Sequence, residues 1–165
     1  MLIQDGIPTR EDLSRVLPPE SRLAKGAVAI AECFQNIPCN PCSQACPKGA
    51  IQVAPDINAT PQIDFDRCIG CGICVGQCPG LAIFVVDMTY SEDTALVQLP
   101  YEFLPVPQPG QMVQCLDRAG VVQGCYPVVK VSGGKKNQTW LVSVAVPRDL
   151  AMEIRNIRVG GEADA

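Results

Sequence analysis

One run of cysteines near the middle of the chain has a spacing suited to metal chemistry. In CIGCGICVGQCP, two residues separate Cys68, Cys71 and Cys74 from one another, Cys78 follows after three more, and Pro79 comes next. Three thiolates at this spacing on one tight loop can reach three corners of a single iron–sulfur cube, while the fourth cysteine points toward a second cluster. The run is therefore a far more specific signal than a lone CxxC pair.

A second, incomplete copy of this run lies upstream. A constant shift along the chain superposes several pairs of residues: Cys39 on Cys71, Cys42 on Cys74, Cys46 on Cys78, Pro47 on Pro79, Ala50 on Ala82 and Ile51 on Ile83. The two half-motifs therefore form an internal repeat.

With these motifs, roughly residues 27–90 resemble the bacterial-type two-cluster 4Fe-4S ferredoxins. The resemblance implies two 4Fe-4S clusters that are cross-ligated, each taking cysteines from both copies of the motif. Position by position, one cluster would be held by Cys68, Cys71 and Cys74 with Cys46. The other would take three of its ligands from the remaining cysteines of the repeat: Cys39, Cys42 and Cys78.

The upstream motif departs from the family pattern at its first cysteine, because Asn36 stands at that position. Cys33 is the nearest candidate to replace the missing thiolate, and a loop containing Pro38 can accommodate its wider spacing. Three alternatives stay open: a 3Fe-4S cluster held by Cys39, Cys42 and Cys78, a ligand from elsewhere in the chain, or a buried and inert Cys33.

Composition narrows the classes of function and the cellular setting. The net charge of −4 argues against a nucleic-acid footprint, which needs clustered Lys and Arg, so the expected partners are proteins. The absence of histidine removes Rieske-type ligation, His-ligated haem and His-based catalysis. Ten cysteines could form a disulfide framework, but the N-terminus lacks the features of a signal peptide, and short CxxC spacings suit metal sites better. We therefore expect reduced thiolates in the cytoplasm.

The chain is rich in apolar residues, but its sequence does not have the pattern of a membrane protein. It is 47% hydrophobic and 18% charged, against roughly 25% charged residues in an average domain. No uninterrupted apolar stretch approaches the about 18 residues of a membrane span, so no span is expected. The apolar residues could fill a core around the clusters or form a surface for a partner subunit.

Local patterns predict the elements around the repeat. Thr9 to about Leu17 reads as a capped helix in an N-terminal extension of residues 1–26. Ala27 to Glu32 reads as a strand that enters the first cluster loop, and a helical turn is expected after each cluster-motif proline. Two pairs of segments should form antiparallel strand pairs: 51–54 with 62–65, and 82–89 with 94–99.

The composition changes after residue 99. The prolines of residues 100–109 predict a stiff linker, since proline cannot sit in a central strand. Residues 110–165 read as strands followed by a terminal helix from Pro147 to about Ile157, with Cys115 and Cys125 as core thiols. The expected fold class is α+β: a ferredoxin-like double repeat with two cluster loops over residues 27–99, followed by a small β-rich C-terminal domain.

The predicted function follows from the two clusters. A cluster with four cysteine ligands has no open position for a substrate and passes one electron at a time, so the sequence predicts a non-catalytic electron-transfer subunit of an oxidoreductase. The form ECFQNIPCNPC is similar to small ferredoxin-like subunits of FAD-dependent amino-acid or opine-type dehydrogenases, which implies a flavin-containing dehydrogenase partner. The alternatives are a freestanding ferredoxin carrier and a structural zinc-binding module.

Overall fold

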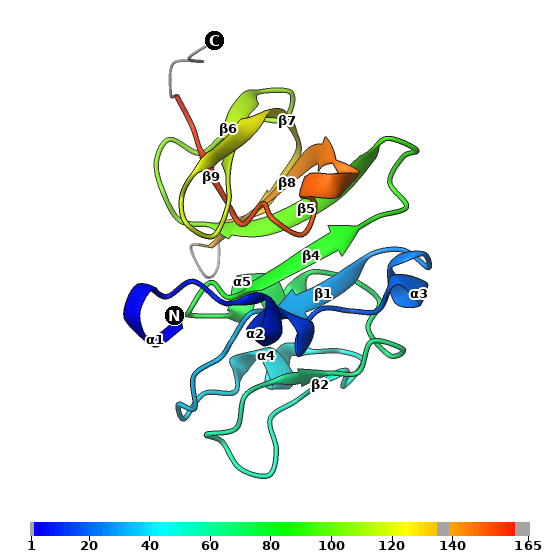
Figure 1. The fold of residues 1–165 in the computed structure, drawn as a ribbon, viewed down its shortest axis with the longest axis vertical. Coiled ribbons are helices and arrows are strands. Elements are labelled where there is room, and N and C mark those ends of the chain that lie inside the picture. The colour runs from blue at the N-terminus through cyan, green and yellow to red at the C-terminus, as the bar shows by residue number, and fades with distance from the viewer. Residues whose placement is uncertain (1, 135–138, 161–165) are drawn as a thin grey trace.

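The structure, a computed structural model, describes residues 2–134 and 139–160. Its main feature is a seven-stranded sheet with the order β1-β4-β5-β8-β7-β6-β9, beside a two-stranded sheet of β2 and β3. In Figure 1 the strands β5 to β9 form the upper part of the molecule and α4 lies below, with β1, β4 and α5 in between. The α+β class is confirmed. None of the helices within the described residues has the length and apolar character needed to cross a bilayer.

Three short helices form the N-terminal extension: α1 (Leu2–Asp5), α2 (Arg10–Ser14) and α3 (Glu20–Leu23). The expected capping box begins α2, because the Asp12 backbone N–H donates to the Thr9 hydroxyl and the Asp12 carboxylate accepts from the Thr9 N–H. The helix ends at Ser14, before the predicted Leu17.

The cluster motifs contribute most of the remaining short elements: α4 (Pro41–Ala45), β2 (Ile51–Gln52), β3 (Gln62–Ile63) and α5 (Ile73–Gln77). The predicted hairpin is confirmed in shorter form, with Ile51 opposite Ile63. The turn expected after each cluster-motif proline is present as a single hydrogen-bonded turn, closed by Gly49 N–H to Cys46 O and by Leu81 N–H to Cys78 O. The helices α4 and α5 lie before the fourth cysteine of each motif.

Two strands separate the cluster part from the rest of the sheet: β1 (Val28–Ala31) and β4 (Ile83–Asp87), which pair antiparallel. Strand side chains alternate between the two faces of a sheet. On one face, Ile30 and Phe84 join the large apolar core of the β-rich part. On the other face, Ala31 and Val85 join a smaller core that includes Cys42 and other cysteines of the motifs. This pair of strands therefore packs against a different core on each of its two faces.

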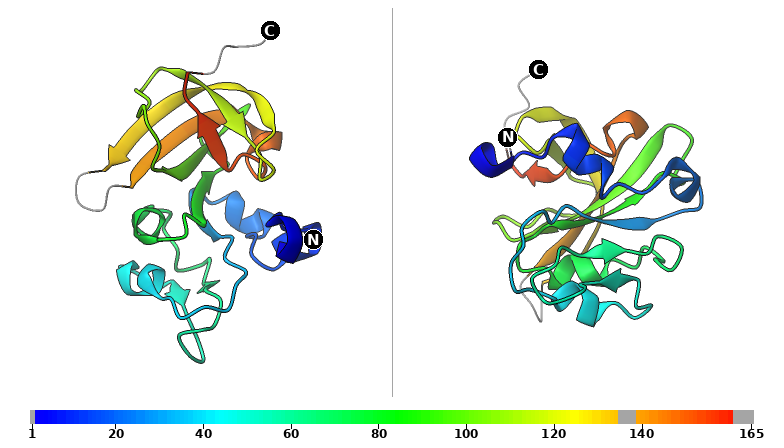
Figure 2. Two further views of the ribbon diagram at one scale, coloured as in Figure 1. Left: turned by 90° about the vertical axis from the view of Figure 1, so that its left-hand side faces the viewer. Right: turned by 60° about the horizontal axis from the view of Figure 1, so that its bottom comes forward.

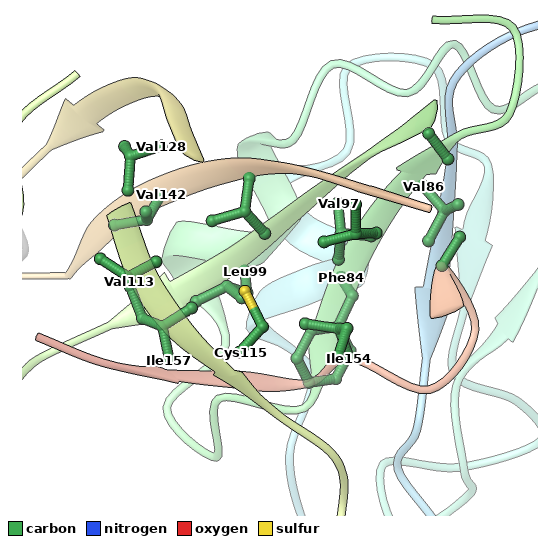
Figure 3. Close-up of a cluster of buried hydrophobic side chains, with 14 of the residues drawn as sticks. Phe84, Val86, Val97, Leu99, Val113, Cys115, Val128, Val142, Ile154 and Ile157 are labelled. Atoms are coloured by element: carbon green, nitrogen blue, oxygen red, sulfur yellow. The ribbon is translucent and has the colours of Figure 1, made fainter. Parts of the chain in front are cut away.

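The large core lies inside the curled sheet of β5 (Thr94–Tyr101), β6 (Met112–Leu116), β7 (Val122–Gly133), β8 (Trp140–Pro147) and β9 (Asn156–Arg158). Figure 2 shows this curl from two further directions. The side chains gathered there come from strands far apart in sequence, as Figure 3 shows for Phe84, Leu99, Val113, Val142 and Ile157. Such β-branched and aromatic residues suit a buried, pleated surface.

Pro100 lies inside β5, which corrects the expectation that it cannot belong to a central strand. β5 pairs with β4 only as far as Gln98, so at Pro100 it is paired with β8 alone, where Pro100 lies opposite Leu141. A proline has no N–H to donate and is tolerated at such a locally open edge. The other prolines of the segment lie between β5 and β6.

Strands on both sides of residues 100–109 belong to one sheet. β5 ends inside this segment, at Tyr101, and β8 follows it; the two strands are paired from Thr94 opposite Pro147 to Tyr101 opposite Trp140. The domain boundary expected at the segment therefore does not divide the sheet. The division into a domain of residues 27–99 and a domain of residues 110–165 stays a prediction.

The predicted terminal helix is wrong. Only the short 3-10 helix η1 (Arg148–Leu150) forms, and the chain then enters β9, which pairs with β6 by placing Ile157 opposite Cys115. Ile154 and Ile157 are buried, but Ile154 lies in the irregular segment before β9 and Ile157 lies in β9 itself. Their helix-like spacing was misleading because pairing with the open edge of β6 decides the local structure.

Candidate metal centre

Two cavities in the cluster part are each lined by four cysteines. Cys33, Cys39, Cys42 and Cys78 line the first, and we name it the Cys33 site. We name the second the Cys68 site. Its cysteines are Cys46, Cys68, Cys71 and Cys74. The structure therefore brings together the same two sets that the sequence and the resemblance suggest, with Cys33 beside the first.

The two helices explain how each motif reaches both cavities. α4 carries Cys42 in its first turn and is capped at its C-terminus by Cys46, while α5 carries Cys74 and is capped by Cys78. Each helix therefore presents a cysteine from its body to one cavity and its C-terminal cysteine to the other. Pro41 begins α4, where the fixed φ and missing N–H of proline cause no loss of hydrogen bonding.

Glycines allow the loop of the Cys68 site to turn sharply. Gly70 has φ +67°, and a Cβ there would lie 2.5 Å from the backbone of Ala27, just before β1. Gly72 has φ +77° at the N-cap of α5, and a Cβ there would collide with the Gln98 side chain. The left-handed conformation and the close approach both favour glycine. The loop is thereby held close to the start of β1 and to β5.

Backbone N–H groups point at cysteine sulfurs in both sites. Ala29 N donates to Cys68 Sγ at 3.4 Å and Ala50 N to Cys46 Sγ at 3.3 Å. At the Cys33 site, Ala82 N donates to Cys78 Sγ at 3.4 Å. Donors of this kind stabilise thiolate ligands and tune the potential of a cluster.

Burial sets the protonation of the thiols. It raises the pKa of Cys74 to about 12 and also raises the pKa of Cys42 and Cys33. At Cys46, burial acts to raise the pKa, but backbone N–H groups, with that of Ala50 foremost, outweigh it and lower the pKa. The buried thiols therefore keep their protons in neutral solution unless a cation replaces them. A bound metal does so, because a coordinating thiol is deprotonated.

The donor set fits iron–sulfur clusters. All ten cysteines are free thiols, and eight of them surround the two cavities. Among the described residues, no three Cys, Asp or Glu side chains converge closely enough to hold a single metal ion. Cysteines that are spread around a cavity suit a 4Fe-4S cluster, because each cysteine binds an iron at a different corner of the cube. A bound 4Fe-4S cluster would supply reversible one-electron chemistry, and the cysteines would hold it in place.

Sequence reasoning missed one residue of the site. Arg22, in α3 of the N-terminal extension, is 8% exposed and donates to the carbonyl oxygen of Cys68 at 2.7 Å. An arginine in a short, ordinary-looking helix carries no pattern that links it to a cysteine far along the chain. Only the folded arrangement reveals the contact.

Comparison with known protein families agrees with this geometry. Residues 37–82 match the family described as the 4Fe-4S dicluster domain. The matched segment is a ferredoxin-type 4Fe-4S domain. It contains every cysteine of the two sites except Cys33, which precedes it.

Proteins of several kinds are similar to parts of this chain. The ferredoxin-type protein NapF of Haemophilus influenzae is 40% identical over 61 residues, which cover 36% of this chain and 35% of the relative. Pyruvate synthase subunit PorD of Methanocaldococcus jannaschii is 47% identical over 47 residues, 28% of this chain and 52% of the relative. Translation initiation factor RLI1 of Saccharomyces cerevisiae is 30% identical over 109 residues, 58% of this chain and 17% of the relative.

The matches span about half or less of each of these relatives. No solved structure matches the chain significantly.

Proposed function

We propose that the protein is an electron-transfer subunit that carries two 4Fe-4S clusters and relays single electrons between a flavoprotein dehydrogenase and an acceptor. The observation that carries this proposal is the pair of four-cysteine cavities, with each motif contributing to both. In the proposed arrangement, the Cys33 site and the Cys68 site each hold one cluster. Cys33 replaces the ligand that Asn36 cannot supply.

The chemistry of the cavities supports a carrier over a catalyst. Four thiolates saturate the protein-facing positions of a cube, so no open position is left for a substrate. The remaining lining of both cavities is dominated by apolar and small residues, as at Ile37, Pro41 and Ala59 in the Cys33 site. A saturated cluster in such surroundings can change its charge by one electron without binding anything else.

Exposed isoleucines beside both cavities support a protein partner. Ile37 is 47% exposed at the Cys33 site, and Ile69 is 56% exposed at the Cys68 site. An apolar contact placed next to a cluster shortens the path of an electron to a docked protein. The relative named as a subunit of pyruvate synthase also favours the role of a subunit.

A flavoprotein is the partner that suits two one-electron centres. A reduced flavin holds two electrons, which two clusters can accept singly. Anaerobic purification of the complex from its native cells, with identification of the chains and of flavin absorbance, tests this partner. A complex that contains flavin supports the proposal, and purification as an isolated chain favours a freestanding carrier instead.

A further inference from the structure

We propose that the Cys68 site holds the cluster of higher reduction potential, because Arg22 and neighbouring cations surround it while the Cys33 site has an uncharged lining. The inference rests on the proposed function, since it requires a cluster in each cavity. It assigns to the N-terminal extension a role in the redox chemistry of the dicluster domain. Arg22 acts there as a positioning residue and as a fixed positive charge.

Arg22 is held by backbone carbonyl groups. Nε donates to Phe65 O at 2.6 Å, and Nη1 donates to Gly26 O at 3.0 Å. Nη2 donates to Ala27 O at 2.9 Å and to Cys68 O at 2.7 Å. The guanidinium therefore fastens the loop that contains Cys68 to the chain that leads into β1.

The positive charge of Arg22 has no carboxylate partner among the described residues. The salt bridges between described residues involve Arg15, Arg118 and Arg155 instead. Burying a charge is costly unless an opposite charge or strong hydrogen bonds compensate for it. The carbonyl dipoles compensate in part, and a cluster with four thiolates, which carries net negative charge, is the natural counterion beside Cys68.

Further cations lie around the Cys68 site. Lys48 lines the cavity itself. Arg67 lies against the turn after Cys46, where a Cβ on Gly49 would be 3.3 Å from its guanidinium nitrogen. Lys25 shares a surface hollow with Arg22 and Cys68. Asp66 borders the same hollow, and Asp64 lies two residues before Asp66 in an exposed turn. These two acidic side chains are outnumbered by the four cations.

The Cys33 site differs in charge. Among the described residues, its lining contains no charged side chain. Glu32 precedes Cys33, but its carboxylate is paired with Arg118 and Arg155 at 2.7 Å each, and Arg118 also contacts Glu153. The charges of this group largely cancel. Hydrogen bonds to sulfur favour the same order, because two backbone N–H groups donate to cysteine sulfurs at the Cys68 site and one does so at the Cys33 site.

Coulomb attraction then orders the two potentials. Reduction adds one electron to a cluster and breaks or forms no covalent bond, so the reduced form gains more from a nearby positive charge than the oxidised form does. The buried position of Arg22 limits screening of this attraction by water. An electron that enters at either cavity therefore settles on the Cys68 site.

Four variants of the full chain test the order of potentials. Lys48→Gln and Arg22→Gln each remove a positive charge at the Cys68 site, and Arg22→Lys keeps the charge while losing the forked hydrogen bonds. Lys130→Gln is the matched control, because Lys130 is exposed on β7 and lines neither cavity. Each protein is loaded with clusters anaerobically and titrated with dithionite as the electron donor. Electron paramagnetic resonance follows the two reduction steps.

We expect two separate one-electron steps in the unmodified protein. The step at higher potential should shift downward in Lys48→Gln and in Arg22→Gln, should be largely retained in Arg22→Lys, and should stay in place in Lys130→Gln. The step at lower potential should not move. If Arg22→Gln does not retain its cluster, Lys48→Gln decides, since Lys48 is exposed.

Three results would overturn the inference: a downward shift of the lower step in place of the higher one, equal shifts of both steps, or no shift in Lys48→Gln. Two steps at the same potential in the unmodified protein would also overturn it. Iron analysis of the same samples separates these failures from failure of the proposed function. A chain that never binds two clusters would remove the proposed function, and the inference with it.

Discussion

Arg155 Nε donates to Glu32 Oε1 at 2.7 Å, although 123 positions separate the two residues in the sequence. Arg118 binds the same carboxylate through both of its oxygens, at 2.7 and 2.8 Å. Glu32 directly precedes Cys33, whereas the arginines come from the turn after β6 and from the segment before β9. This buried network therefore links the Cys33 site to the β-rich part of the molecule.

Glu32→Gln should be strongly destabilising, because it removes the buried carboxylate that Arg118 and Arg155 share. Removing one partner of a buried ion pair costs about 3–5 kcal/mol. Glu11→Gln is the control, since Glu11 and Arg15 form an exposed pair that contributes at most about 1 kcal/mol. Denaturant unfolding of both variants measures the difference. Similar small losses in the two variants would mean that the network is not stabilising.

Gly70→Ala should impair the Cys68 site much more than Gly120→Ala. Both glycines have a positive φ, +67° and +79°, so an alanine is strained by about 1–2 kcal/mol at either position. Only at Gly70 would the new Cβ also collide with backbone, that of Ala27. Iron content per chain and thermal stability should fall together in Gly70→Ala. Equal behaviour of the two variants would contradict the close approach as the reason for this glycine.

The cysteines of each motif could be read from the sequence because their spacing is local, whereas their division into two crossed sets was implied by the resemblance to two-cluster ferredoxins. A motif of four cysteines fixes which thiols can share a loop, and the repeat identified the second loop although Asn36 interrupts its pattern. The strand pair of β4 and β5 was also predicted, since alternation and a short turn are properties of neighbouring residues.

Long-range contacts explain what the sequence could not reveal. Ile154 and Ile157 have the spacing of a helix, but the open edge of β6 draws Ile157 into a strand. Pro100 argued against a central strand, yet β5 is singly paired at that point. The contact of Arg22 with Cys68 likewise depends on how the N-terminal extension packs, which no local pattern encodes.

Cys33→Ser should remove or convert the cluster of the Cys33 site and leave the Cys68 site reducible. The side chain of Cys33 lines only the former of the two sites. Cys125→Ser is the control, because Cys125 is exposed and lines neither cavity. Iron content and the two reduction signals should change in the first variant alone. An unchanged pair of signals in Cys33→Ser would show that Cys33 is not a ligand.

Asn36→Cys is the companion test. It restores the family spacing at the position where a ligand is missing, and Asn36 is exposed, held by a hydrogen bond to Asn58 O at 3.1 Å. In a Cys33→Ser background it should recover part of the lost iron. Failure to recover any iron would argue that the loop near Cys33 cannot adopt the shorter spacing.

Cys115 and Cys125 should differ in reactivity toward iodoacetamide. Cys115 is fully buried, and burial raises its pKa to about 12, whereas Cys125 is exposed, which corrects the expectation that both are core thiols. A thiol whose pKa is raised in the folded state stabilises the fold below its ordinary pKa of 9.0, and this contribution is lost as the pH rises from there toward about 12. Mass spectrometry at pH 8 should find Cys125 labelled and Cys115 protected. Equal labelling would mean that the core opens readily.

Iron and acid-labile sulfide analysis of the anaerobically purified full chain tests the central claim most directly. Two 4Fe-4S clusters predict a brown protein with about eight iron and about eight sulfide per chain, together with two one-electron reduction signals. About seven iron per chain would instead place a 3Fe-4S cluster at the Cys33 site and leave Cys33 without a ligand role. Stoichiometric zinc without sulfide would contradict the account, since the cavities would then hold single ions and carry no electrons.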